Sequence, residues 1–119
     1  MASVMIVEDD PDTREMLERF LELEGFEVRT AANGQLALES LETDSGLSVI
    51  LLDLMMPVMN GWQFREAQTN DPRIAGIPVV VVTAAGSKDD IPAIHADAWL
   101  SKPVDLDRLL ATLGALCNR

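Results

Sequence analysis

The sequence contains one cysteine, few basic residues and no long apolar run, and each shortage excludes a class of protein. Cys117 is the only cysteine among the 119 residues, so no internal disulfide can form, which fits a reducing compartment. The chain has only 9 basic residues and 20 acidic ones, which gives a net charge of −11 at pH 7. This balance argues against direct binding to nucleic acid or to an anionic membrane.

Membrane insertion and secretion are also disfavoured. The longest apolar runs, at residues 49–52 and 79–82, are far shorter than the roughly 20 residues that cross a bilayer. The N-terminus lacks the basic-then-apolar order of a signal peptide. We therefore predict a cytoplasmic protein without a membrane partner, organised as a single domain over residues 1–119.

Short apolar runs alternate with amphipathic stretches along the whole chain. The runs that predict strands are residues 4–7, 26–30, 48–52, 78–82 and 99–101. Stretches that predict helices begin at Pro11, Gly34, Trp62 and Asp105. Residues 87–94 are a poor helix candidate because Pro92 interrupts them. Because most of the strands are apolar throughout, we expect an α/β protein whose parallel sheet is covered by helices on both faces.

The helix predicted from Pro11 has one apolar face and one charged face. Its apolar residues at helical spacing are Met16, Leu17, Phe20, Leu21 and Leu23. On the outside, Arg14 with Glu18 and Glu15 with Arg19 have the i,i+4 spacing of ion pairs. Asp10 precedes this helix and suits an N-cap.

Polar residues follow four of the predicted strands. They are Glu8, Asp9 and Asp10 after the first, Asp53 after the third, Thr83 after the fourth and Lys102 after the fifth. The carboxyl ends of parallel strands share one edge of a sheet, where sites of such folds lie. Clustered carboxylates suit a hard cation such as Mg²⁺, and with a lysine and a hydroxyl they are equipped for phosphoryl transfer through an aspartyl-phosphate.

Four short motifs at these strand ends resemble a known family. They are Val-Glu-Asp-Asp at 7–10, the segment 51–61 from Leu-Leu-Asp to Met-Asn-Gly, Val-Thr-Ala at 82–84 and Ser-Lys-Pro at 101–103. Together they are similar to the receiver domain of response regulators in two-component signalling. The resemblance implies a flavodoxin-like (βα)5 three-layer sandwich with strand order 2-1-3-4-5. From Thr83 to Lys102 the chain is about three residues short for this family, nearly a helical turn, so helix four is expected to be short or irregular.

The resemblance also implies a role for each residue at the sheet edge. Asp53 would be the phosphoacceptor. Asp9 would bind Mg²⁺ directly together with Asp53, the Met55 backbone carbonyl would be a further ligand, and Glu8 would act through water.

A second group of residues would contact the phosphoryl group or respond to it. Lys102 would bridge the acidic site and then the phosphoryl group, and Lys102–Pro103 would be a cis peptide. Thr83 would bond a phosphoryl oxygen, assisted by the Ala84 backbone N–H. Trp99 has two interpretations: a switch aromatic working with Thr83, or a side chain that fills a gap between helix and sheet.

The implied partners follow from the same resemblance. A sensor histidine kinase or a histidine phosphotransfer protein would donate the phosphoryl group, and an unknown downstream protein would dock on the switched surface. The domain would catalyse its own phosphorylation and dephosphorylation without being a metabolic enzyme. Because the sequence stops after the last predicted helix, we expect either a stand-alone regulator or a piece of a larger one.

Four other functions compete with this one, and the sequence argues against each. A small phosphatase with an aspartyl nucleophile wants a second acid two residues later, where this chain has Met55. A pseudo-receiver that docks partners without phosphorylation would not need the acids, Thr83 and Lys102, although their presence does not exclude it. A flavodoxin would need a phosphate loop in place of 8–10, and a dinucleotide binder would need a G-x-G-x-x-G turn.

Overall fold

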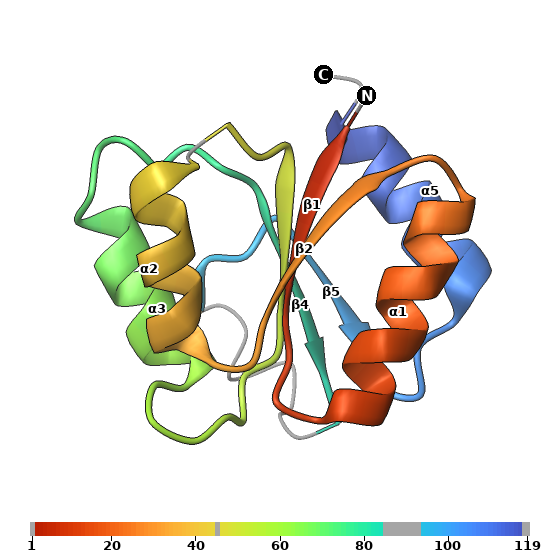
Figure 1. Ribbon diagram of the computed structural model, residues 1–119, viewed down its shortest axis with the longest axis horizontal. Helices are drawn as coiled ribbons and strands as arrows, with labels where there is room; N and C mark the ends of the chain where they lie inside the picture. The colour runs from red at the N-terminus through yellow and green to blue at the C-terminus, as the bar shows by residue number, and fades with distance from the viewer. Residues whose placement is uncertain (1, 45, 85–93, 118–119) are drawn as a thin grey trace.

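A computed structural model describes residues 2–44, 46–84 and 94–117 and shows a parallel sheet between two layers of helices (Figure 1). The elements are β1 (Ser3–Val7), α1 (Pro11–Leu23), β2 (Glu27–Ala31), α2 (Gly34–Thr43), β3 (Val49–Leu52), α3 (Gly61–Thr69), β4 (Val79–Thr83), β5 (Ala98–Ser101) and α5 (Leu106–Cys117). The five strands lie in the order β2-β1-β3-β4-β5, all parallel. The flavodoxin-like fold predicted from the sequence is confirmed.

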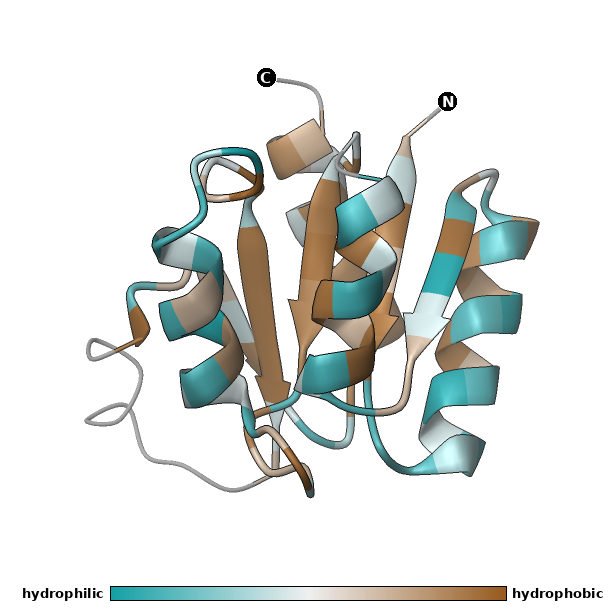
Figure 2. Cartoon of the chain, turned by 60° about the vertical axis from the view of Figure 1, so that its left-hand side comes forward, coloured by the Kyte–Doolittle hydropathy of each residue, from teal (hydrophilic) through white to brown (hydrophobic). Residues whose placement is uncertain are grey.

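The strands bury their two faces in two separate cores. Side chains alternate along a strand, so Met5 and Val7 of β1 pack toward α2 and α3, while Val4 and Ile6 pack toward α1 and α5. In Figure 2 the interior strands are mostly apolar, β2 at the edge is more hydrophilic, and the helices turn polar surface outward. Covering on both faces explains why β3 and β4 are continuous apolar runs in the sequence.

Capping residues place the first turns of three helices close to the carboxyl ends of the strands. Asp10 accepts hydrogen bonds from the Thr13 backbone N–H, at 3.3 Å, and from the Thr13 hydroxyl, and the hydroxyl bond is the main reason that the pKa of Asp10 lies below its usual value. Asn33 caps α2 in the same way. Asn60 begins α3 in a reciprocal capping box with Gln63. The predicted capping role of Asp10 is confirmed.

The predicted apolar face of α1 is wrong at two positions. Leu17 and Leu21 are buried as expected, but Met16 is 43% exposed and Leu23 is 87% exposed. Leu23 is the last residue of the helix, beyond the part that covers the sheet. Met16 lies at the border of the buried stripe, which is narrower than the set of apolar residues.

The predicted ion pairs on α1 are half correct. Arg19 and Glu15 pair at 2.8 Å on the exposed surface. Arg14 instead turns away from Glu18, and its Nη1 donates to the backbone carbonyl of Glu8 at 2.9 Å. An exposed i,i+4 pair stabilises a helix by only about 0.3–0.5 kcal/mol, less than a charged donor gains from a partly buried carbonyl.

A polar network around the buried Gln68 of α3 was not predicted. The Gln68 side chain is fully buried, and its amide nitrogen donates to the carbonyls of Ile74, at 2.9 Å, and Ile77, at 3.1 Å. Arg65 donates to the Gln68 amide oxygen and also to the backbone carbonyls of Ile94 and His95. These bonds tie α3 to the segments that enter β4 and β5.

Two further predictions concern the length and placement of helices. The expectation of a short or irregular helix at residues 87–94 falls outside the described residues except for Ile94, which is buried. Within the described part of the chain, no helix has both the length and the apolar character that crossing a membrane requires.

Candidate functional site

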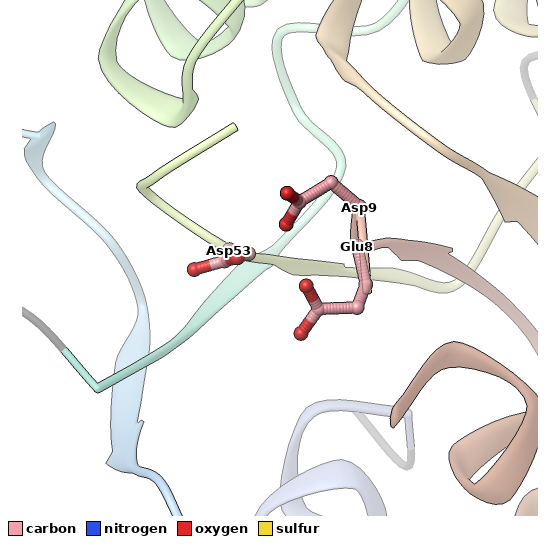
Figure 3. Close-up of side chains that lie close together, drawn as sticks. All are labelled: Glu8, Asp9 and Asp53. Carbon is pink, nitrogen blue, oxygen red and sulfur yellow. The ribbon is translucent and has the colours of Figure 1, made fainter. Parts of the chain in front are cut away.

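Carboxylates from two interior strands meet at one edge of the sheet. Glu8 and Asp9 directly follow β1, and Asp53 directly follows the neighbouring β3. Each contributes an oxygen to a group whose members all lie within 4.8 Å of one another. Figure 3 shows the three side chains pointing from the strand ends into one shared space. The predicted convergence of these acids is confirmed.

A lysine from the edge strand compensates part of this negative charge. Glu8 and Asp53 are only 3% and 6% exposed, so their charges require partners within the protein. The Lys102 ammonium donates to Glu8 Oε1 and lies 3.5 Å from Asp53 Oδ2. Burial alone would lower the pKa of Lys102, but the hydrogen bond to Glu8 and the charge of Asp53 outweigh it and raise the pKa above its usual value. Lys102 is therefore a cation at neutral pH.

Backbone hydrogen bonds hold the acidic strand ends in place. The Glu8 N–H donates to the carbonyl of Ala31 in β2, and the Asp53 N–H donates to the carbonyl of Val7 in β1, both at 3.0 Å. The Met55 N–H donates to Asp53 Oδ1 at 3.4 Å. The parallel ladder thus extends one residue beyond each strand, to the residues that carry the carboxylates.

The predicted hydroxyl and ammonium groups are joined through their backbones. Thr83 ends β4 and is buried, and Ala84 follows it at the surface. The Lys102 N–H donates to the Thr83 carbonyl at 3.1 Å. The Lys102–Pro103 peptide is cis, as expected. Because β4 and β5 are neighbours in the sheet, these residues reach the same edge as the acids.

Trp99 and Met55 occupy different environments. Trp99, in β5, is half-buried and packs against the core under α2 and α3. This packing agrees with the gap-filling interpretation, and a switching role stays a prediction. Met55 is 57% exposed beside Asp53. The apolar side chain of Met55 therefore does not fill the core, and its backbone lies next to the acidic group.

The donor set fits a hard divalent cation. Carboxylate oxygens are the ligands that Mg²⁺ prefers, and this ion keeps several waters rather than a full protein cage. Asp9 is exposed, so the acidic group opens to solvent on one side. A cation reaching that side would meet oxygen ligands whose mutual repulsion it relieves.

Gly61 allows the backbone around Asp53 to pack closely. Its N–H donates to the Leu54 carbonyl at 2.9 Å, and a Cβ at this position would lie 2.7 Å from the Asp53 carbonyl oxygen and 2.8 Å from Leu54 Cα. Both of these are backbone atoms, which cannot swing aside as a side chain can. The site therefore requires glycine at position 61. The family motif that ends at Gly61 contains this signal, whereas the pattern of polar residues at strand ends does not.

We expect Gly61→Ala to lower the free energy of unfolding by about 2–3 kcal/mol, because the added methyl forces the Asp53–Leu54 backbone to move. Urea unfolding followed by tryptophan fluorescence measures this. Gly114→Ala is the matched control: it lies within α5, a Cβ there meets nothing within 4 Å among the described residues, and the change should stabilise by about 0.5–1 kcal/mol. Equal stability of Gly61→Ala and the unsubstituted protein would contradict the expectation.

Comparison with known proteins agrees with this geometry. A family model described as response regulator receiver domain matches residues 4–114. The transcriptional regulatory protein CpxR homolog of Haemophilus influenzae is 36% identical over 124 residues, covering 100% of this chain and 52% of that protein. The transcriptional regulatory protein PrrA of Mycobacterium tuberculosis is 41% identical over 122 residues, covering 98% of this chain and 50% of that protein. The chain thus spans about half the length of the curated relatives it matches.

Solved structures show the same fold over nearly the whole of this chain. The chemotaxis protein CheY4 of Vibrio cholerae superposes with a TM-score of 0.90 at 33% identity, covering 98% of both chains. The signal receiver domain of a DNA-binding response regulator (merR) from Colwellia psychrerythraea gives a TM-score of 0.89 at 30% identity, covering 100% of both chains.

Proposed function

The chain belongs to the family of response regulator receiver domains, and on this premise we propose that it takes a phosphoryl group onto the Asp53 carboxylate in a Mg²⁺-dependent reaction. The observation that carries the proposal is the position of Asp53. This carboxylate is buried, shares a space with Glu8 and Asp9, and has a lysine ammonium 3.5 Å from one of its oxygens. A nucleophile, oxygen ligands for a cation and a fixed positive charge therefore occupy one sheet edge.

The acidic residues provide the metal site in this proposal. Asp9 and Asp53 are the carboxylate ligands, the Met55 backbone carbonyl is a third ligand, and Glu8 acts through water. When bound, Mg²⁺ supplies positive charge that offsets the phosphoryl oxygens and the crowded carboxylates. Glu8 also holds the Lys102 ammonium, so its carboxylate has a partner before any cation arrives.

Asp53 is the nucleophile in the transfer step. One of its oxygens attacks phosphorus in line with the leaving nitrogen of a phosphohistidine, so a P–O bond forms as the P–N bond breaks. Lys102 neutralises charge on the transferred oxygens, and the Thr83 hydroxyl and the Ala84 N–H donate to them. The domain supplies most of the catalysis by positioning these groups, for both phosphorylation and dephosphorylation.

We propose that phosphorylation then changes a protein-docking surface. The Thr83 hydroxyl moves toward the new phosphoryl oxygens, and Trp99 on the adjacent strand responds to the space that this opens. The donor is a sensor histidine kinase or a histidine phosphotransfer protein in the cytoplasm, and the recipient of the signal is another protein. The net charge of −11 supports docking to protein rather than direct contact of this chain with nucleic acid or membrane.

The two rival functions have less support. An aspartyl-nucleophile phosphatase would have an acid in the place of Met55, which presents an exposed thioether beside Asp53 instead. A pseudo-receiver would have no use for a buried aspartate paired with a lysine. Phosphoacceptance accounts for both observations.

The test is chemical phosphorylation of the unmodified protein. Incubation with acetyl phosphate and Mg²⁺ should add one phosphoryl group by intact mass, and hydroxylamine should remove it because an acyl phosphate is labile to this nucleophile. With EDTA in place of Mg²⁺ the adduct should fall at least about tenfold. Beryllofluoride with Mg²⁺ should change the tryptophan fluorescence. No adduct with Mg²⁺, or an equal adduct in EDTA, would contradict the proposal.

A further inference from the structure

The side chain of Arg14 folds back over the turn between β1 and α1. Its Nη1 donates to the Glu8 carbonyl at 2.9 Å, and its backbone N–H donates to the Asp10 carbonyl, also at 2.9 Å. Helix side chains tilt toward the N-terminus, which is why a residue in the first turns of α1 can reach the strand end before it. Arg14 thereby binds the carbonyl groups on both sides of Asp9.

The Glu8 carbonyl belongs to the peptide that joins Glu8 to Asp9. The orientation of this peptide sets the direction in which both carboxylates leave the backbone. The Glu8 N–H is already held by Ala31, and Glu8 Oε2 accepts from the Asp10 N–H at 3.2 Å. The bond from Arg14 restrains the Glu8–Asp9 peptide itself, through its carbonyl oxygen.

The position of Arg14 is unfavourable for helix stability alone. A cation in the first turns of a helix lies at the positive end of the helix dipole. Among the described residues no ion pair to Arg14 is found, although Glu18 is available at the i,i+4 spacing. The guanidinium is instead committed to one backbone carbonyl beside the acidic group.

We infer that Arg14 is a positioning residue for the acidic site: its guanidinium fixes the Glu8–Asp9 peptide so that both carboxylates face Asp53. The inference rests on the proposed function, in which Mg²⁺ binds at these carboxylates. It assigns the effect of Arg14 to hydrogen-bond geometry rather than to its charge.

Charge and geometry predict opposite results when Arg14 is replaced. Removing a cation near clustered carboxylates strengthens the attraction for Mg²⁺ if charge alone matters. Removing the bond to the Glu8 carbonyl weakens Mg²⁺ binding if the bond orients the ligands, as is usual for residues that support metal ligands. The sign of the change in affinity therefore separates the two.

The experiment is a titration of the ¹⁵N-labelled protein with MgCl₂, followed by the amide shifts of the β1–α1 turn. Arg14→Met keeps the aliphatic stem and should raise the dissociation constant about tenfold. Arg14→Lys keeps the charge but places it on one ammonium nitrogen in place of the planar guanidinium, so its affinity for Mg²⁺ should fall between those of Arg14→Met and the unsubstituted protein. Arg19→Met is the matched control on the same helix and should leave the affinity unchanged, since the ion-pair partner of Arg19 within the described part of the chain is Glu15 on the surface. The melting temperature without Mg²⁺ should stay nearly constant in all three.

The outcomes separate the inference from the proposed function. If the unsubstituted protein does not bind Mg²⁺ at these amides, the proposed function fails. If it binds, and Arg14→Met binds equally or more tightly, or Arg19→Met weakens binding as much, the positioning role is wrong. If Arg14→Met melts much lower, Arg14→Lys decides: weaker Mg²⁺ binding at an unchanged melting temperature supports the role, and unchanged binding overturns it.

Discussion

Asp53→Asn should accept no measurable phosphoryl group from acetyl phosphate in the presence of Mg²⁺, a loss of at least about 1,000-fold. The amide keeps the shape of the side chain but removes the anionic oxygen that attacks phosphorus. It also removes one of three clustered carboxylates, so Mg²⁺ should bind more weakly. The measurements are intact mass after incubation and the beryllofluoride response of the tryptophans.

Stability should move in the opposite direction from activity. Removing one member of a repelling acidic group leaves Lys102 paired with Glu8, so the melting temperature without metal should be unchanged or higher. Asp71→Asn is the matched control, because it makes the same chemical change away from the acidic site. Asp71 lies between α3 and β4, near the amino ends of the strands, and pairs with Arg73. A phosphoryl adduct of equal yield in Asp53→Asn and Asp71→Asn would show that Asp53 is not the acceptor.

Lys102→Met should separate metal binding from phosphoryl transfer. Phosphorylation by acetyl phosphate should fall about 100-fold, because the variant lacks the fixed cation that neutralises the transferred oxygens. The affinity for Mg²⁺ should rise, because a positive charge 3.5 Å from Asp53 Oδ2 no longer competes with the metal. If Lys102 only balanced the charge of the carboxylates, Mg²⁺ could replace it. Lys102→Met would then be phosphorylated normally at saturating Mg²⁺.

The same substitution should make stability depend on the metal. Glu8 and Asp53 are nearly inaccessible to solvent, so loss of their common partner should destabilise the metal-free protein by about 2–3 kcal/mol. Added Mg²⁺ should restore more stability to the variant than to the unsubstituted protein. Arg73→Met, which removes an exposed pair with Asp71, serves as the control and should change neither metal affinity nor phosphorylation. Equal Mg²⁺ affinity in Lys102→Met and Arg73→Met would contradict the predicted competition.

The parts of the fold and site that could be predicted share one physical origin. Strands covered on both faces must be apolar throughout, and they end where a polar residue appears. Asp53 and Thr83 therefore mark both the end of a strand and the edge of the sheet. Parallel pairing brings those ends together whatever the rest of the sequence contains. The strand order was predicted only from the family resemblance, because an apolar run does not indicate which strands it pairs with.

The features that could not be predicted depend on competition between partners. Arg14 has a carboxylate at the expected helical spacing, yet it donates to a backbone carbonyl that the turn brings nearer. In the sequence, Gln68 is not distinguishable from the other polar residues of a weakly amphipathic helix. Its side chain is buried because its amide donates to two backbone carbonyls in the segment after α3, which only the folded chain brings near. Apolar periodicity carries no information on such backbone acceptors. The exposed end of α1 at Leu23 similarly depends on where the sheet stops.

The site is built across a gradient of local stability. Glu8, Asp9 and Asp53 extend from β1 and β3, each of which has a strand on both sides, whereas Lys102 extends from β5 at the rim of the sheet. Rim strands open to solvent more readily than interior ones, since fewer backbone bonds must break. A transient opening of β5 would carry Lys102 away and leave the carboxylates in register. The acidic half of the site thus extends from the better protected strands, and the basic half extends from the strand that we expect to open first.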